Sequence, residues 1–272
     1  MRRGRRILLI VVVQAAGYGC RAPGVATAKG NPSPCTYDHG GIVRGPRDSK
    51  RIALIFTGGS FGEGTESILD ALQARGVRGS FFVTGDFLRK PEHQACLRRI
   101  VAQGHYLGPH SDKHPLYCPW EDRSRTLVTE EAFRSDLEKN LADLSKYGPR
   151  REQMRFFIPP YEWYNESIVE WTKRMGLVLF NFTAGSHSNA DYASDDDKAY
   201  MSSAKIYESI LNFETTQPDG LNGFILLLHL GSGPGRTDKM HPYVGKLLDE
   251  LKKRGYELIR VDEMLAAALK EQ

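Results

Sequence analysis

The stretch IALIFTGGSF, residues Ile52 to Phe61, decides how the rest of the chain is interpreted. Its apolar first half is typical of a buried strand, and the glycines that follow indicate a turn. Similar apolar runs precede amphipathic segments elsewhere, as in GSFFVTG followed by EHQACLRRIVAQG, and RFFIPP followed by NESIVEWTKRMG. This pattern predicts βα units, and therefore an α/β fold with a parallel sheet and helices outside it.

The series continues to the end of the chain. Further strands are predicted in LVLFNFT, GFILLLHL and YELIRV, and further helices at 203–213, in PYVGKLLDELKKRG and in DEMLAAALK. Five glycines end helical segments as left-handed caps would: Gly76, Gly104, Gly148, Gly176 and Gly255. About seven units predict a single closed or nearly closed barrel, in which chemistry belongs at the carboxyl ends of the strands.

The N-terminal region indicates export. Four arginines among the first six residues account for the formal net charge of +4, so the remainder offers little electrostatic support for a nucleic-acid partner. They precede the apolar run ILLIVVVQAAGYGC, which is typical of a secretory signal. We expect a signal peptide at 1–19, a tether rich in Pro, Gly and Ala at 20–48, and the barrel at 49–272.

The four cysteines suggest one modification site and no zinc finger. Cys20 resembles the lipid-accepting cysteine of a bacterial lipoprotein, although Gly17 stands where that pattern favours leucine. Ordinary cleavage near this point and a retained, uncleaved anchor are the alternatives. Cys35, Cys96 and Cys118 lack metal-ligand spacing, so we expect buried thiols with at most one disulfide among them.

Histidines follow two of the predicted strands. His110 and His114 come after GHYLG, and a helical turn there would place both imidazoles on one face, where they could share a metal. Separate structural roles for the two rings are the alternative. GFILLLHL ends at His229, which fits either a general acid or base at the barrel mouth or a satisfied core histidine.

A third strand end carries the segment FFIPPYEWYN. Paired prolines restrict the loop after the strand, and we expect them to present Tyr161, Glu162 and Trp163 over the barrel mouth.

Together these segments resemble the successive motifs of the polysaccharide deacetylases, the NodB-type domain of carbohydrate esterase family four, from about Arg51 to Arg260. The resemblance implies a single distorted (β/α)7 barrel, a divalent metal, zinc being the expected ion, and hydrolysis of N- or O-acetyl groups on glycans. It also implies roles for particular residues: His110 and His114 as metal ligands, His229 as the catalytic acid, and Pro159, Pro160 and Tyr161 as the loop whose backbone helps to bind the oxyanion.

The chain departs from the family at the opening stretch. Family members have Thr-Phe-Asp-Asp-Gly where residues 55–59 read Ile-Phe-Thr-Gly-Gly, so Thr57 replaces the general base and Gly58 replaces the third metal ligand. Ile158 replaces the arginine that orients the base, and Gly185 aligns with the acid that tunes the catalytic histidine. Such coordinated loss fits a catalytically silent carbohydrate-binding protein with a weakened metal site.

A rebuilt active site is the other interpretation. Glu162 is then the first candidate for the missing base and Asp112, between the two histidines, is the second. Asp191 could belong to the site or to a charged surface loop with its acidic neighbours. We expect a bacterial cell-envelope lipoprotein that acts on or binds a glycan and touches the membrane only through a lipid anchor.

Aromatic residues in the same loops support a carbohydrate ligand, because sugar rings stack on exposed aromatic faces. They are Tyr117, Trp120, Trp163, Tyr164 and Tyr192. Packing of some of these rings beneath the loops is the alternative.

Overall fold

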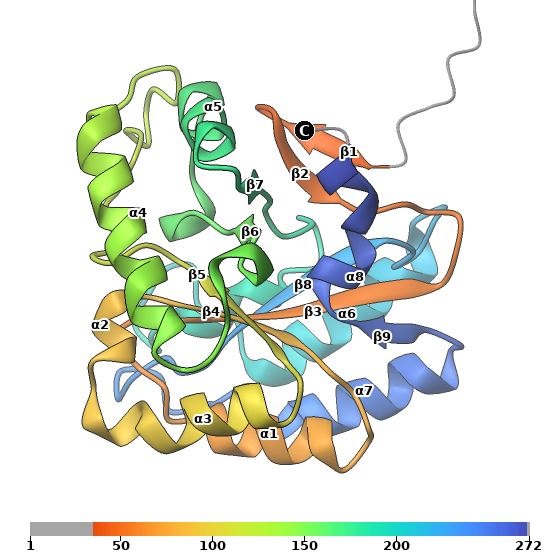
Figure 1. Ribbon diagram of the computed structural model, residues 1–272. Coiled ribbons are helices and arrows are strands. Elements are labelled where there is room, and N and C mark those ends of the chain that lie inside the picture. The colour runs from red at the N-terminus through yellow and green to blue at the C-terminus, as the bar shows by residue number, and fades with distance from the viewer. Residues whose placement is uncertain (1–34, 271–272) are drawn as a thin grey trace, which may run out of the picture. The chain divides into compact units, whose positions relative to one another are not determined.

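The computed structural model describes residues 35–270, so the predicted signal peptide and Cys20 lie outside the described residues. A parallel sheet forms the centre of the fold (Figure 1). Strand β3 (Arg51–Gly58) pairs along one edge with β8 (Phe224–His229). Along its other edge it pairs with β9 (Glu257–Ile259) at its start and with β4 (Ser80–Val83) at its end, and β5 (Tyr106–Pro109) pairs with β4.

The remaining strands are short. Strands β6 (Phe156–Phe157) and β7 (Val178–Leu179) form a separate parallel pair, and β1 (Thr36–Asp38) and β2 (Gly41–Arg44) form an antiparallel hairpin. Within residues 35–270 the strand ladders do not close into a complete barrel. The hairpin lies inside the predicted tether 20–48, so the folded domain begins earlier than the predicted boundary at residue 49.

Helices follow the strands as the sequence predicts, and α1, α3 and α7 lie side by side against one face of the sheet (Figure 1). The helices are α1 (Thr65–Gln73), α2 (Gly85–Leu88), α3 (Gln94–Ala102), α4 (Glu130–Ser145), α5 (Glu166–Arg174), α6 (Ser203–Thr216), α7 (Val244–Lys253) and α8 (Val261–Met264). Short 3₁₀ turns are η1 (Pro91–His93), η2 (Arg151–Gln153), η3 (Pro160–Glu162), η4 (Ser188–Tyr192), η5 (His241–Tyr243) and η6 (Ala266–Lys270). In the part of the chain described, no helix combines the length and the apolar character needed to cross a bilayer.

Local signals explain where several helices begin and end. The side chains of Thr129, Asn165 and Ser202 accept hydrogen bonds from the first turns of α4, α5 and α6. All five predicted cap glycines have positive φ, between 61° at Gly76 and 118° at Gly148. The predicted terminal helix is shorter than expected, because α8 ends at Met264 and a 3₁₀ turn follows.

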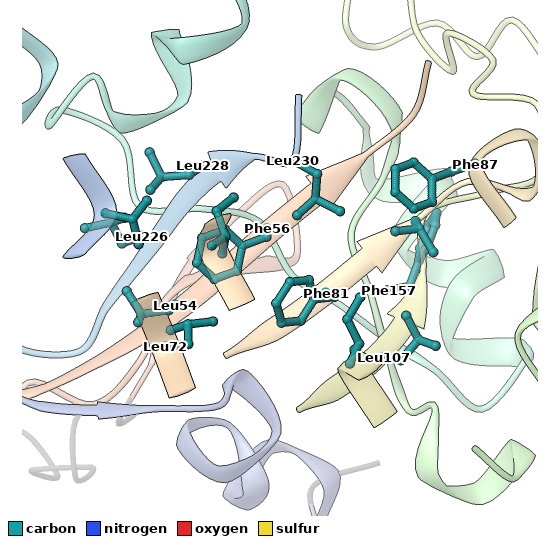
Figure 2. Packing of buried hydrophobic residues seen from close by; sticks show 14 of the residues in the cluster. Leu54, Phe56, Leu72, Phe81, Phe87, Leu107, Phe157, Leu226, Leu228 and Leu230 are labelled. Carbon is teal, nitrogen blue, oxygen red and sulfur yellow. The ribbon is translucent and has the colours of Figure 1, made fainter. Parts of the chain in front are cut away.

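Side chains of β3 project to opposite faces, and this fixes the position of the site. Leu54 and Phe56 pack on the helix side of the sheet, together with Leu72 of α1 (Figure 2). Ala53 and Ile55 belong to the second cluster, on the other face. Burying each large apolar side chain stabilises the fold by about 1.5–3 kcal/mol. The alternation places Thr57, next on the face of Ile55, at the end of β3 and in register with His229.

Candidate active site

A cavity of about 1200 Å³ opens at the carboxyl ends of the central strands. Its lining includes residues from β3, from the ends of β5 and β8, and from the loops after β6 and β7. The cavity lining includes Thr57, His110, His114, Glu162, Asn181 and His229. The location agrees with the prediction that chemistry belongs at the strand ends.

The structure brings His110 and His114 together, with ring centroids 5.0 Å apart. The predicted helical turn between them is wrong, because Ser111 and His114 have φ values of 70° and 53°, outside the helical region. Instead, the Ser111 Oγ accepts a hydrogen bond from the His114 N–H at 2.9 Å, and Asn140 of α4 accepts one from the His110 N–H at 3.0 Å. A bent loop, fixed by side-chain hydrogen bonds, therefore pairs the two rings.

Both imidazoles are uncharged at neutral pH. Burial lowers the pKa of His110 well below its usual range and lowers the pKa of His114 to about 4, and neighbouring histidines act in the same direction. His110 Nδ1 lies 2.9 Å from the carbonyl oxygen of Ile158, so Nδ1 carries the proton and donates, which leaves Nε2 with a free lone pair. Neutral rings oriented by such a bond are in the state that metal ligation requires.

The described residues do not complete a site for the family's divalent metal. Gly58 stands at the third ligand position, and a Cβ there would lie 2.8 Å from Leu230 Cδ1 and 3.0 Å from Phe87 Cε2. Thr57 is 2% exposed, and its hydroxyl has no hydrogen-bond partner in the described part of the chain. Within residues 35–270 no three His, Cys, Asp or Glu side chains are grouped so that they could hold a metal ion. We therefore assign no catalytic step to a metal.

His229 is held by a buried carboxylate. Asp191, in η4, is 3% exposed and accepts hydrogen bonds from His229 Nδ1 at 2.6 Å and from the His229 backbone N–H at 2.9 Å. Burial acts to lower the pKa of His229, but the Asp191 carboxylate outweighs it and the pKa is raised. Asp191, and not position 185, where the family resemblance places the tuning acid and this chain has Gly185, supplies the carboxylate that holds this histidine.

Glu162 enters the cavity from an unusual backbone conformation. Tyr161 and Glu162 have φ values of 59° and 53°, in the left-handed region, and Asn181 Nδ2 donates to the Glu162 carbonyl oxygen at 2.7 Å. Burial raises the pKa of Glu162 to about 7, His229 opposes this shift, and the Asp191 charge adds to it. Glu162 is therefore coupled to the His229–Asp191 pair, a coupling that sequence spacing did not indicate.

Asp112 does not reach the cavity. Its carboxylate is 3% exposed and pairs with Arg89 Nη1 at 2.5 Å and Lys139 Nζ at 2.9 Å. Its backbone N–H donates to Asp136 of α4 at 2.8 Å. These contacts commit the carboxylate to ion pairs beneath the histidine loop, so the structure does not bring it together with Glu162 and His229.

Aromatic rings form one wall of the cavity. Trp120, 59% exposed, lies with its ring centroid 5.7 Å from that of Tyr161 and 5.8 Å from that of Trp163. Trp163 Nε1 donates to Pro119 O at 3.2 Å, which fixes its ring. Tyr117 and Tyr164 are fully buried and pack in the core beneath the loops, so neither ring is exposed to a sugar.

Strand order, parallel pairing and this strand-end cavity define an α/β fold of the NodB deacetylase type. Residues 44–180 match the family model for polysaccharide deacetylase, and the chain belongs to that family of hydrolases.

One curated relative is the peptidoglycan-N-acetylglucosamine deacetylase PgdA of Listeria monocytogenes, 25% identical over 82% of this chain and 40% of the relative. This chain thus spans less than half of that protein. A Bacillus anthracis protein described as a family-four pseudoenzyme, BA3943, has a TM-score of 0.65 at 18% identity, covering 84% of this chain and 70% of that one. A family-four acetyl xylan esterase from Clostridium thermocellum, solved in complex with a cobalt ion, has a TM-score of 0.62 at 23% identity, covering 80% and 91%.

Proposed function

We propose that this chain hydrolyses acetyl groups from a glycan with a rebuilt site, in which Glu162 takes over the role of the missing aspartate base. The observation that carries the proposal is the position of Glu162 in the lining of the same cavity as His229, with a pKa that burial and the Asp191 charge raise to about 7. A carboxylate that titrates near neutral pH is suited to accept a proton at physiological pH.

The proposed chemistry needs three groups. The Glu162 carboxylate removes a proton from water as the water oxygen attacks the acetyl carbon. The carbonyl oxygen then becomes an oxyanion, for which the Tyr161 N–H is a donor with no acceptor among the described residues. His229, protonated beside Asp191, donates its Nε2 proton to the leaving amine or alkoxide as the bond to the acetyl carbon breaks.

Glycan binding would use the aromatic wall. Tyr161, Trp120 and Tyr192 are 46%, 59% and 52% exposed, so each offers a ring face or edge to a sugar. Trp163 and Pro160 hold the loop that carries Tyr161. PgdA is named as acting on peptidoglycan, so an N-acetylated cell-wall glycan is the first substrate to test and acetylated xylan the second.

A divalent metal, zinc by family resemblance, remains a proposed cofactor at His110 and His114. The neutral rings support it and the absent third carboxylate weakens it. Export and lipidation at Cys20 also remain proposals, because that region lies outside the described residues.

A silent carbohydrate-binding protein is the second candidate function. It is favoured by Thr57 and Gly58 at the base and ligand positions and by the missing group of three metal ligands within residues 35–270. In this case the aromatic wall would bind the glycan and the remaining polar groups would be remnants.

Acetate release from acetylated chito- and xylo-oligosaccharides separates the two functions. We expect turnover by the wild type, a reduction of roughly 10²-fold in kcat for Glu162→Gln, and nearly unchanged binding. Glu170→Gln is the matched control, because Glu170 of α5 is exposed and its ion-pair partner among residues 35–270 is Arg174. Binding without turnover by the wild type would establish the silent function.

A further inference from the structure

Arg236 is a fully buried cation in the loop that follows His229. Its side chain is 0% exposed, and its nearest carboxylate oxygen, Asp238 Oδ2, is 3.8 Å away. Its nitrogens instead donate to four uncharged oxygens: Asp238 O at 2.6 Å, Ala193 O at 3.0 Å, Met201 O at 2.8 Å and Ser203 Oγ at 3.2 Å. A buried charge is expensive, so this arrangement depends on nearly complete hydrogen bonding of the guanidinium.

These contacts connect two segments that are far apart in sequence. Ala193 lies two residues after Asp191, Met201 lies just before α6, and Ser203 is the first residue of α6. Arg236 itself lies seven residues after His229, in the loop that leaves β8. The guanidinium thus fastens both ends of the segment 193–203 to the loop 230–240, with the ring of Tyr200 4.9 Å from its carbon.

We infer that Arg236 is a positioning residue: it fixes the segment 193–203, which directly follows η4, so that the Asp191 carboxylate at the end of η4 meets His229. The catalytic consequence rests on the proposed function, whereas the positioning itself does not. Arginine suits this role because its planar fork offers five donors in fixed directions. Lysine has three donors on one nitrogen, so it cannot replace the separate nitrogens that contact Asp238 O, Ala193 O and Met201 O.

The same two segments are also joined by Ser203, whose N–H donates to Asp238 Oδ2 at 2.5 Å and whose Oγ donates to Asp238 O at 3.1 Å. The contacts of Asp195 contribute less. Thr237 Oγ1 donates to Asp195 at 2.6 Å, and the Asp195 N–H donates to Gly235 O at 2.9 Å, but the Asp195 side chain is exposed. Solvent can replace an exposed hydrogen bond at little cost, whereas carbonyls facing the buried guanidinium would be left without partners. Removing Arg236 should therefore loosen the segment more than removing either exposed contact.

The test is the low-field proton resonance of His229 Nδ1–H, which a short hydrogen bond to a carboxylate produces. The reference variant Asp191→Asn should abolish it in the full chain. We expect Arg236→Met to lose or strongly broaden it and Arg236→Lys to broaden it. The control Lys198→Met changes an exposed cation within the segment 193–203, and it should retain the resonance.

An unchanged resonance in Arg236→Met would overturn the inference. If that variant does not fold, Arg236→Lys is the fallback, because it keeps the charge and loses the separate contacts of Nη1 and Nη2. A sharp, unchanged resonance in Arg236→Lys would count against the inference. The kcat of Arg236→Lys should fall by roughly tenfold with little change in KM. Loss of the resonance in a protein without any turnover would leave the positioning role intact and reject only the proposed function.

Discussion

Replacing Asp191 by Asn tests the buried pair on which the proposed chemistry depends. The Asp191 carboxylate accepts two hydrogen bonds from His229, at 2.6 Å and 2.9 Å. Asparagine offers one oxygen in place of two, so one buried donor loses its partner, at a cost of about 1–3 kcal/mol at any pH. The favourable charge interaction with protonated His229 is lost as well, and that part depends on pH.

The sign of the pH dependence follows from the raised pKa of His229. A histidine whose pKa is higher in the folded than in the unfolded state stabilises the folded protein at pH values below its unfolded pKa, about 6.5. This stabilisation disappears as pH rises through the pKa of the folded state. A hydrogen bond between charged partners contributes about 1–2 kcal/mol more than one between neutral partners. Asp191 also raises the pKa of Glu162, so its removal relieves some destabilisation at high pH.

Urea unfolding at pH 6 and pH 9 measures the effect. We expect Asp191→Asn to be less stable than the wild type at both values, with a deficit larger at pH 6 by about 1–2 kcal/mol. Asp196→Asn, an exposed change in the same loop, is the control and should be neutral. Equal deficits of Asp191→Asn at the two pH values would refute the charge pairing.

Three further changes probe the altered site and the N-terminal region. Gly58→Asp should destabilise the fold by about 1–3 kcal/mol in urea unfolding, because its Cβ would lie 2.8 Å from Leu230 Cδ1. Adding Leu230→Ala to this variant should recover part of the lost stability, and the double variant should bind divalent metal more strongly than the wild type. Elemental analysis should find more divalent metal in the wild type than in His110→Ala/His114→Ala, and equal metal content would exclude the site. The wild type should release its metal as pH falls toward the pKa of His114, about 4. Cys20→Ala should move the mature protein from the detergent to the aqueous phase, and identical partitioning would exclude lipidation.

Much of the fold was predictable because strand and helix signals are local. A few neighbouring residues are enough to recognise the apolar runs, the cap glycines such as Gly148 and the histidine at the end of β8. The hairpin at 36–44 was missed, because its strands are short and lie in a segment rich in Pro and Gly. Strand β7 is only two residues long within the predicted 177–183, since the chain leaves the ladder after a single bridge at Phe180.

The site was only partly predictable because its contacts join distant segments. Asp191 contacts His229 across 38 positions of sequence, and the local sequence does not distinguish Asp191 from the other acidic residues of the same loop. Glu162 was chosen from its place after the oxyanion tyrosine, but its coupling to His229 depends on two left-handed residues that no local pattern specifies. Asp112 had suitable spacing, yet Arg89 and Lys139 hold it beneath the loop.

The pH dependence of acetate release tests the central claim most directly. With Glu162 as the base, kcat/KM of the wild type should rise through about pH 7, the pKa of that carboxyl group, and fall again as His229 loses its proton. Glu162→Gln should lose the rising limb near pH 7 together with most of the activity. A wild-type profile without a limb near pH 7, or one that Glu162→Gln leaves unchanged, would contradict the rebuilt active site.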